Sequence, residues 1–247
     1  MLKRLPLFFG AALVAVFSFS DASAALRDPF KQLDDVWPTP DAQRRASGAP
    51  GPGYWQQQAD YVIDVELDET NNRILGSETI TYHNNSKDTL DYLWMQLDQN
   101  LFDPNMMAHQ SRTTSGLNDQ SFNQFEGLLN AQEFDGGYKI TAVKDAAGKP
   151  LKHVIVQTMM RIIPPQPLKP GGKITFSVDW SFNIIDATKI RSRMGYEFFK
   201  EDKNHLYALA QWFPRMCAYT DVTGWQNKQF LGTGEFALEF GDYLVRI

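Results

Sequence analysis

The side chains that could carry chemistry in this chain are few and scattered. The four histidines lie far apart in the sequence, at His83, His109, His153 and His205. No His-x-His pair and no HExxH helix occurs, and a single cysteine excludes a zinc site built on a cysteine pair. A G-x-S-x-G nucleophile elbow is also absent. The sequence therefore predicts no metal site and no catalytic residue within this chain.

Cys217 is the one thiol, and it lies in the segment FPRMCAY, two residues after Arg215. A neighbouring cation lowers the pKa of a thiol and makes it reactive. A lone cysteine between Met216 and Ala218 is, however, more often a small buried apolar residue. We predict burial rather than reactivity. Because no second cysteine exists for a disulfide, packing of the core must hold the fold.

The tryptophans offer a different chemistry, since the faces of aromatic rings bind sugars and other flat ligands. Those that follow the N-terminal region are Trp55, Trp94, Trp180, Trp212 and Trp225. In β-rich domains, large aromatic side chains also fill the core. We predict that they fill the core and keep a ligand platform as the alternative.

The first residues are typical of an export signal. MLKR is a short basic start, an uncharged apolar run of 16 residues follows, and Ala22-Ser23-Ala24 has the small residues that signal peptidase recognises. The run is short for a membrane span, although an uncleaved anchor helix is the alternative. We predict a signal peptide over residues 1–24. The mature chain is then exported, periplasmic or secreted, with no further membrane span.

The exported part of the chain is acidic. Removal of residues 1–24 takes away two cations and one anion, so the net charge of −5 becomes −6. This balance argues against nucleic acid as a partner. Residues 25–53 form a lead-in, and its second half, 38–53, holds four prolines and three glycines. We expect exposed, extended chain there and an ordered domain over residues 54–247.

Period-two alternation predicts β-strands from residue 54 onward. The turn segment ETNNR lies between two alternating stretches, 59–68 and 74–85, which predicts a hairpin. Further strands are expected over 89–102, 138–144, 151–159, 173–184, 235–240 and 243–247, the second and third of these as a strand–turn–strand unit. Helical periodicity is not sustained anywhere after the signal. The predicted fold class is all-β and mainly antiparallel, a sandwich or a saddle-shaped pair of sheets.

Two segments do not fit a compact β domain. Residues 103–137 are rich in Asn and Gln, and we expect a long loop in which FNQFEGLLNAQEF forms one or two helical turns. The chain also ends at Ile247 inside an alternating strand, without a polar tail. Natural termini are usually polar and frayed, so we expect this sequence to be a fragment of a longer protein.

Several stretches, in their order along the chain, resemble the N-terminal domain of exported zinc metallopeptidases of the aminopeptidase N family, the gluzincins. The resemblance covers roughly residues 45–247, and the closing segment is its most specific part. The stretches are GAPGPGYWQQQADYVIDVELDETNNRILGSETITYHNNS, LDYLWMQLDQNLF, RMGYEFF and QWFPRMCAYTDVTGWQNKQFLGTGEFALEFGDYLVRI.

The resemblance implies a saddle-shaped β domain that precedes a thermolysin-like catalytic domain. That second domain would carry the HExxH helix, bind zinc and cleave N-terminal residues from peptides. In many relatives an N-domain Gln-x-Glu element also holds the α-ammonium of the substrate. Here Gln211 matches the Gln, but Phe213 stands where the Glu would be. Gln211 is therefore the one candidate substrate-binding residue, and aminopeptidase specificity is in question.

The predicted function is that of a non-catalytic N-terminal domain that packs against the missing catalytic domain and walls its substrate cleft. The isolated chain should hold no cofactor and be inactive, with zinc expected in the catalytic domain and peptide as the substrate of the whole enzyme. Two alternatives stay open. One is a free-standing secreted β-sandwich module that binds a ligand; the other is a degenerate member that acts only as a scaffold or inhibitor.

Overall fold

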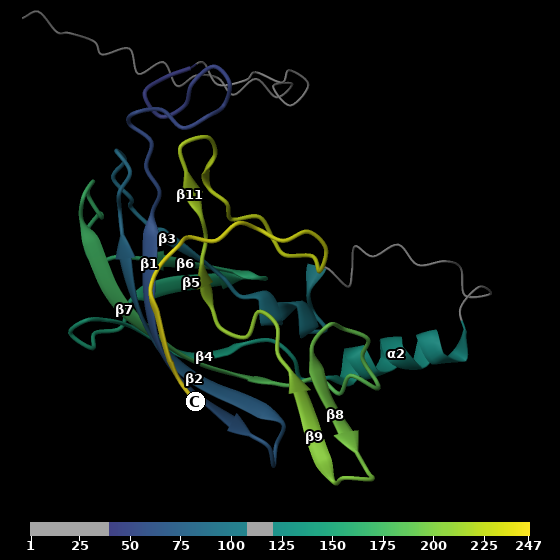
Figure 1. Cartoon of the computed structure of the whole chain (residues 1–247). Helices are drawn as coiled ribbons and strands as arrows, with labels where there is room; N and C mark the ends of the chain where they lie inside the picture. Colours follow the sequence, from purple (N-terminus) through teal and green to yellow (C-terminus); the bar gives the residue numbers. More distant parts are fainter. Residues whose placement is uncertain (1–39, 108–120) are drawn as a thin grey trace, which may run out of the picture. The chain divides into compact units, whose positions relative to one another are not determined.

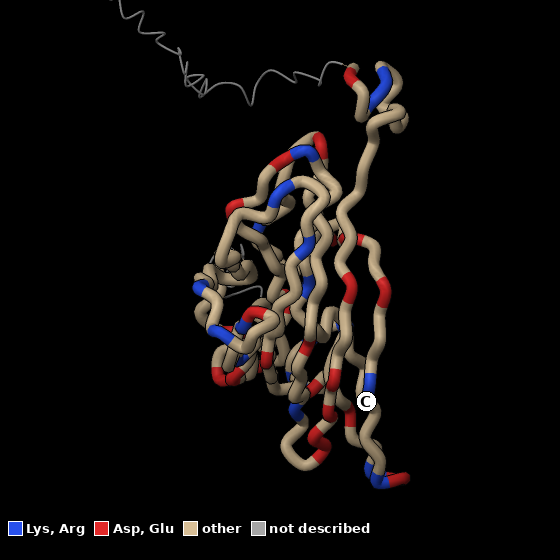
Figure 2. Tube along the Cα trace, turned by 90° about the vertical axis from the view of Figure 1, so that its left-hand side faces the viewer, with Lys and Arg blue, Asp and Glu red and all other residues tan. Residues whose placement is uncertain are grey.

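A computed structural model describes residues 40–107 and 121–247 (Figure 1). The predicted signal peptide and the start of the lead-in lie outside these residues, as does the centre of the expected 103–137 loop. Within the described ranges, no helix is long and apolar enough to cross a membrane. Acidic and basic residues are interspersed along the trace (Figure 2).

The larger sheet has five strands in the order β13-β1-β2-β7-β4. They are β1 (Gln58–Asp68), β2 (Arg73–His83), β4 (Lys139–Asp145), β7 (Lys173–Asn183) and β13 (Tyr243–Arg246). The predicted hairpin is present, because β1 and β2 pair antiparallel along their whole length, from Gln58 opposite His83 to Asp68 opposite Arg73. The chain's last strand departs from this pattern, because β13 pairs parallel with β1.

The second sheet has four strands in the order β10-β3-β6-β5, all paired antiparallel. They are β3 (Leu93–Gln96), β5 (Lys152–Val156), β6 (Met159–Ile163) and β10 (Arg215–Met216). Two small hairpins complete the β structure, formed by β8 (Gly195–Phe199) with β9 (Asn204–Ala208) and by β11 (Tyr219–Thr220) with β12 (Gly224–Trp225). The prediction of an all-β, mainly antiparallel fold is confirmed.

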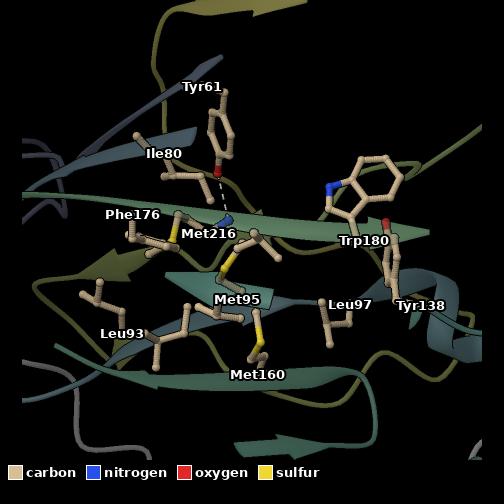
Figure 3. Packing of buried hydrophobic residues seen from close by; sticks show 14 of the residues in the cluster. Tyr61, Ile80, Leu93, Met95, Leu97, Tyr138, Met160, Phe176, Trp180 and Met216 are labelled. Atoms are coloured by element: carbon tan, nitrogen blue, oxygen red, sulfur yellow. Dashed lines mark hydrogen bonds between the residues drawn. The ribbon is translucent and has the colours of Figure 1, made fainter. Parts of the chain in front are cut away.

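The core lies between the two sheets (Figure 3). Strand β3 contributes Leu93 and Met95, which with the following Leu97 are fully buried as their spacing predicted. From the larger sheet, Tyr61 also links the two layers directly, since its hydroxyl accepts a hydrogen bond of 2.9 Å from the backbone N–H of Met216. Each apolar side chain that is fully buried in this way stabilises the fold by about 1.5–3 kcal/mol.

The Pro/Gly-rich segment is tied to the domain in its described part. Arg44 bridges to Pro50 across a turn, and its guanidinium binds both carboxylate oxygens of Asp221 at 2.7 and 2.8 Å. Such a bidentate pair fixes geometry as well as charge. Order therefore begins before Tyr54, the residue at which the sequence predicted it.

The 103–137 segment contains more helix than its composition predicted. A short 3-10 helix, η2 (Asp98–Phe102), precedes it, and α2 (Phe122–Glu133) lies within it. Ser121 caps α2 by accepting from the Gln124 backbone, while the Gln124 side chain accepts from the Ser121 N–H. This capping box is readable as Ser-x-x-Gln in the sequence and was missed. Residues 108–120 of the segment lie outside the described residues.

Two strand predictions are wrong. Residues 235–240 make only isolated bridges, Leu238 to Cys217 and Phe240 to Gln58, instead of a regular strand. The strand expected over 89–102 is limited to β3, because residues 98–102 form η2.

The strand–turn–strand prediction over 138–159 is confirmed. A turn at Asp145 joins β4 to β5, and the Leu151 N–H donates to the Val143 carbonyl at 2.8 Å. This turn carries the chain from one sheet to the other, since β4 pairs with β7 and β5 pairs with β6.

Gly76 on β2 faces the indole ring of Trp180 on β7, its partner in the register. A Cβ atom at this position would overlap that ring. We expect Gly76→Ala to lower the free energy of unfolding by about 1–3 kcal/mol, because the core must shift to accept it. Urea denaturation checks this against Gly127→Ala in α2, where the new methyl meets nothing closer than 3.8 Å. That control should be neutral or stabilising; equal losses in both variants would contradict the packing argument.

Candidate functional site

A cleft of about 920 Å³ opens beside the second sheet. Its walls come from η2, from one side of α2, from the 187–194 loop and from the 230–235 segment. Charged and polar groups that line it include Asp98, Gln99, Arg191, Arg193, Gln211 and Glu235. A concave site of this size with a few converging polar groups is the usual form of a small-ligand or peptide site.

Gln211, the residue predicted from the sequence, lines this cleft. Its backbone has φ of 52°, in the left-handed region that residues other than glycine rarely adopt. Its carbonyl accepts hydrogen bonds from Gln99 Nε2 at 3.1 Å and from the hydroxyl of Tyr138 at 3.2 Å. The surrounding structure therefore holds an unfavourable backbone conformation in place, which is a feature found often at binding sites.

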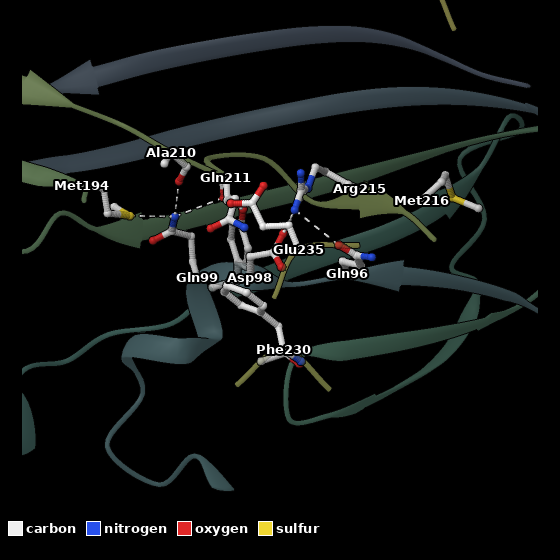
Figure 4. Close-up of polar contacts among 12 residues, drawn as sticks. Gln96, Asp98, Gln99, Met194, Ala210, Gln211, Arg215, Met216, Phe230 and Glu235 are labelled. Atoms are coloured by element: carbon white, nitrogen blue, oxygen red, sulfur yellow. Dashed lines mark hydrogen bonds and ion pairs between the residues drawn. The ribbon is translucent and has the colours of Figure 1, made fainter. Parts of the chain in front are cut away.

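Asp98, which lines the cleft, forms an ion pair with Arg215 (Figure 4). Arg215 donates from Nε to Oδ2 of Asp98 at 3.1 Å, and its Nη2 bonds the same oxygen. The Asp98 side chain is only 1% exposed. Strand β10 positions Arg215 directly opposite Gln96 of β3, and Arg215 also donates to the Gln96 amide oxygen at 3.3 Å. The pairing of two short strands thus builds the site.

Two atoms of this group of side chains are left without a hydrogen-bond partner in the described part of the chain, Oδ1 of Asp98 and Nε2 of Gln96. Burial raises the pKa of Asp98 above its usual value, although the nearby Arg215 opposes the shift. Buried polar atoms are normally satisfied, so an unpaired carboxylate oxygen at a cleft needs an explanation.

A second ion pair lies at the rim, between Arg193 and Glu235. Both side chains are more than half exposed, at 57% and 62%. Glu235 follows Gly232 and Gly234, whose φ values of 88° and 77° set the path of the segment. Sequence reasoning assigned no role to Glu235, Arg193 or Asp98. Asp98 carried a signal, since it is an acid directly after the buried run Leu93–Leu97.

Phe213 stands at the position of the glutamate in the Gln-x-Glu element, and its ring does not replace that carboxylate. It is half-buried and packs edge-on against Tyr61, with ring centroids 5.6 Å apart. Cys217 is fully buried, as predicted, and burial raises its pKa far above the ordinary thiol range. Asp221 pairs with Arg44, as described above, while Trp225 stacks on Tyr82 at 5.9 Å. None of these residues lines the cleft.

The tryptophans divide between two environments. Trp180 is buried in the core at 2% exposure. Trp212 and Trp225 are half-buried and pack against the core, so the core prediction is confirmed for these three. Trp55 and Trp94 are half-exposed, and Trp55 stacks on Tyr219 with ring centroids 5.9 Å apart.

The histidines have separate partners. His83 pairs with Asp60 at 3.0 Å, His153 contacts the carbonyl of Leu151 at 3.0 Å, and His205 lies among the rings of the β8–β9 hairpin. His109 lies outside the described residues. Among the residues that the structure describes, no three His, Cys, Asp or Glu side chains lie together in a way that could hold a metal ion. These residues therefore do not fit a zinc site.

No profile of a known protein family matches the sequence, and no curated protein matches it. Among solved structures, the chain is similar to the M1 zinc metallopeptidase from Deinococcus radiodurans, with a TM-score of 0.34, 12% identity, and coverage of 60% of this chain and 25% of that chain. A mutant of that enzyme bound to a Tyr-Ser-Ala substrate is similar with a TM-score of 0.37 and 11% identity. The match covers 80% of this chain and 33% of that chain. The chain thus spans a quarter to a third of those structures, and similarity at this level carries no argument about function.

Proposed function

We propose that this chain is the N-terminal, non-catalytic domain of an exported zinc metallopeptidase of the aminopeptidase N type, and that it walls one side of the substrate cleft. The single observation that carries the proposal is the position of Gln211. The family resemblance singles out this residue, and it lines the cleft with its backbone in the left-handed region. Zinc and the residues that activate water belong to a catalytic domain, the proposed partner of this one.

Within this proposal, the chain's own residues bind and orient. The Gln211 side-chain amide can donate to a peptide carbonyl and accept from a peptide N–H. Because its backbone is fixed by Gln99 and Tyr138, little freedom is lost when the substrate binds. Fixed contacts of this kind hold a scissile bond in the geometry for attack.

The first test is made on the mature chain alone. We expect less than stoichiometric zinc by atomic absorption and no hydrolysis of aminoacyl-arylamides. Equimolar, tightly held zinc, or zinc-dependent hydrolysis by this polypeptide, would refute the proposal.

In the complete enzyme, Gln211→Ala should raise KM about tenfold for peptide substrates, the effect of losing one or two hydrogen bonds to a bound ligand. Gln56→Ala, at an exposed glutamine away from the cleft, is the matched control and should leave KM unchanged. Steady-state kinetics on a series of tripeptides measures both. Identical KM values for wild type and Gln211→Ala would remove Gln211 from the site.

A second function, a free-standing secreted ligand-binding module, is favoured by one observation. Described residues of this chain line a cleft of about 920 Å³. Titration of tryptophan fluorescence with oligosaccharides and peptides separates the two. Saturation with an oligosaccharide at micromolar concentration would favour the binding module, whereas the domain proposal predicts no response to sugars.

A further inference from the structure

Strand β5 is a free edge of the second sheet. It is the last strand in the order β10-β3-β6-β5, and its residues Val154, Ile155 and Val156 are 43%, 41% and 50% exposed. Exposed apolar edge strands pair with other chains unless the protein protects them. Two other outer strands carry such protection, because β4 has a bulge between Ile140 and Ala142 and β10 is only two residues long. Strand β5 pairs with β6 regularly over five residues, without a bulge.

The register of the β5–β6 hairpin shows which backbone groups of β5 are free. Val156 lies opposite Met159 across the two-residue turn at 157–158. Residues that flank a two-residue turn exchange both backbone hydrogen bonds, and bonded and non-bonded pairs alternate from there. The N–H and C=O groups of Ile155 and His153 therefore point away from β6. They have no backbone partner among the described residues, so β5 offers donors and acceptors at the spacing of a strand.

The β5–β6 hairpin carries only positive charge. Lys152 and Arg161 are exposed, and neither has a carboxylate partner among the described residues. No Asp or Glu occurs between residues 151 and 163, although the whole chain has a net charge of −5. Val154 lies directly opposite Arg161 and two residues from Lys152, so the three side chains share one face of the sheet. A strand added at this edge would place alternate side chains beside the two cations.

The same face continues with residues that are common at protein-binding surfaces. Arg161 lies opposite Trp94 of β3 in the register, and its guanidinium is 5.8 Å from the ring centroid of Tyr92. Tyr92 is exposed and Trp94 is partly exposed. Trp, Tyr and Arg are enriched among the residues that carry binding energy at interfaces. The free edge therefore adjoins a surface suited to a protein partner.

We propose that β5 binds an extended acidic segment of a partner protein, which adds to the second sheet as a strand and places its carboxylates beside Lys152 and Arg161. The backbone groups of His153 and Ile155 supply the hydrogen bonds, and the two cations select an acidic sequence. A second copy of this chain fits less well, because pairing two β5 edges brings together two hairpins of the same charge. None of these residues lines the cleft, so the inference is independent of the proposed function.

The first test is isothermal titration of the full chain with the peptide acetyl-Glu-Val-Glu-Val-Glu-Val-amide and with the same peptide carrying Lys in place of Glu. We expect the acidic peptide to bind and the basic peptide to bind at least about tenfold more weakly. Lys152→Gln and Arg161→Gln should each weaken the acidic peptide about two- to fivefold. Lys173→Gln is the matched control, since it removes one charge from an exposed lysine of β7 in the larger sheet, and it should leave the affinity unchanged.

The second test addresses the added strand itself. Ile155→Pro removes an N–H that the β5–β6 pairing does not use, so the chain should keep its circular dichroism spectrum and bind the acidic peptide at least about tenfold more weakly. Successive N–H groups of an extended peptide point to opposite edges. Methylating alternate peptide nitrogens should therefore abolish binding for one alternate set and preserve it for the other. This comparison uses the wild-type chain and holds even if Ile155→Pro does not fold.

Four results would overturn the inference. They are no binding of the acidic peptide up to about 10 mM, equal affinity for the acidic and basic peptides, equal loss on methylation of either alternate set, and a free chain that is a dimer but becomes a monomer in Ile155→Pro. Sedimentation velocity measures the last of these, which would show that a second copy occupies the edge.

Discussion

Replacing Glu78 with methionine will raise the free energy of unfolding by about 3 kcal/mol at neutral pH. Glu78 lies in the middle of β2, opposite Ile63 and Val178, and is 1% exposed. Neither of its carboxylate oxygens has a hydrogen-bond partner within the described residues. Burial raises its pKa well above the usual value, and no described cation opposes the shift. Burial therefore favours the protonated form of Glu78 in the folded protein.

The sign of the pH dependence follows from this shift. A raised pKa in the folded state means that folding takes up a proton at Glu78 once the pH exceeds the pKa that Glu78 has in the unfolded chain. The contribution of Glu78 is thus most favourable below about pH 4.5 and declines by about 1.4 kcal/mol per pH unit as the pH rises toward the folded-state pKa. The gain from Glu78→Met should therefore be small in acid and large at neutral pH.

Urea denaturation at about pH 5 and about pH 8 measures this difference. Glu239, whose pKa burial raises to about 7, titrates in both proteins and cancels in the comparison. Glu66→Met is the control, because Glu66 is exposed on the neighbouring strand β1, and it should change stability by less than about 0.5 kcal/mol. A loss of stability in Glu78→Met, or a gain that does not depend on pH, would show that Glu78 has a partner that the structure does not contain.

Replacing Arg215 with methionine will destabilise the chain by about 3–5 kcal/mol, because Asp98 is left buried without its cation. Removing Arg215 also removes the cation that most strongly opposes the rise in the pKa of Asp98. The variant should therefore recover relative to wild type as the pH falls and Asp98 becomes protonated. Thermal or urea unfolding at neutral and acidic pH measures both effects.

The double variant Asp98→Asn with Arg215→Met supplies the control. Because neither buried charge is then left alone, it should regain most of the stability that Arg215→Met loses. A double variant that is as unstable as the single one would mean that Arg215 stabilises the fold by packing its aliphatic stem and not by pairing with Asp98.

The sequence predicted the regular β structure well, because local alternation decides it. Leu93, Met95 and Leu97 are all buried, and Ile80 and Tyr82 face the core as their spacing required. The same alternation places Glu78 in phase with Ile80 and Tyr82, so its burial was readable from the sequence and was missed. Helix α2 was underestimated because the Asn- and Gln-rich composition of the segment indicated a loop, although Phe122, Phe125, Leu128 and Leu129 recur at helical spacing.

The site was not predictable in the same way, because its parts meet only through strand pairing. Asp98 and Arg215 are 117 residues apart, and they come together because β10 pairs with β3. Nothing local to either residue indicates that register. The left-handed backbone of Gln211 likewise depends on Gln99 and Tyr138, which hold its carbonyl from distant parts of the chain. The resemblance to a family singled out Gln211, whereas the sequence assigned no role to Glu235 or Arg193.

The most direct measurement of the proposed function is the nucleotide sequence of the gene or transcript beyond codon 247. The proposal predicts that the reading frame continues into a second domain with an HExxH helix and a later glutamate ligand for zinc. Gln211 then becomes testable in the whole enzyme. A stop codon directly after Ile247 would contradict the proposal and leave a free-standing exported domain whose own cleft must account for its function.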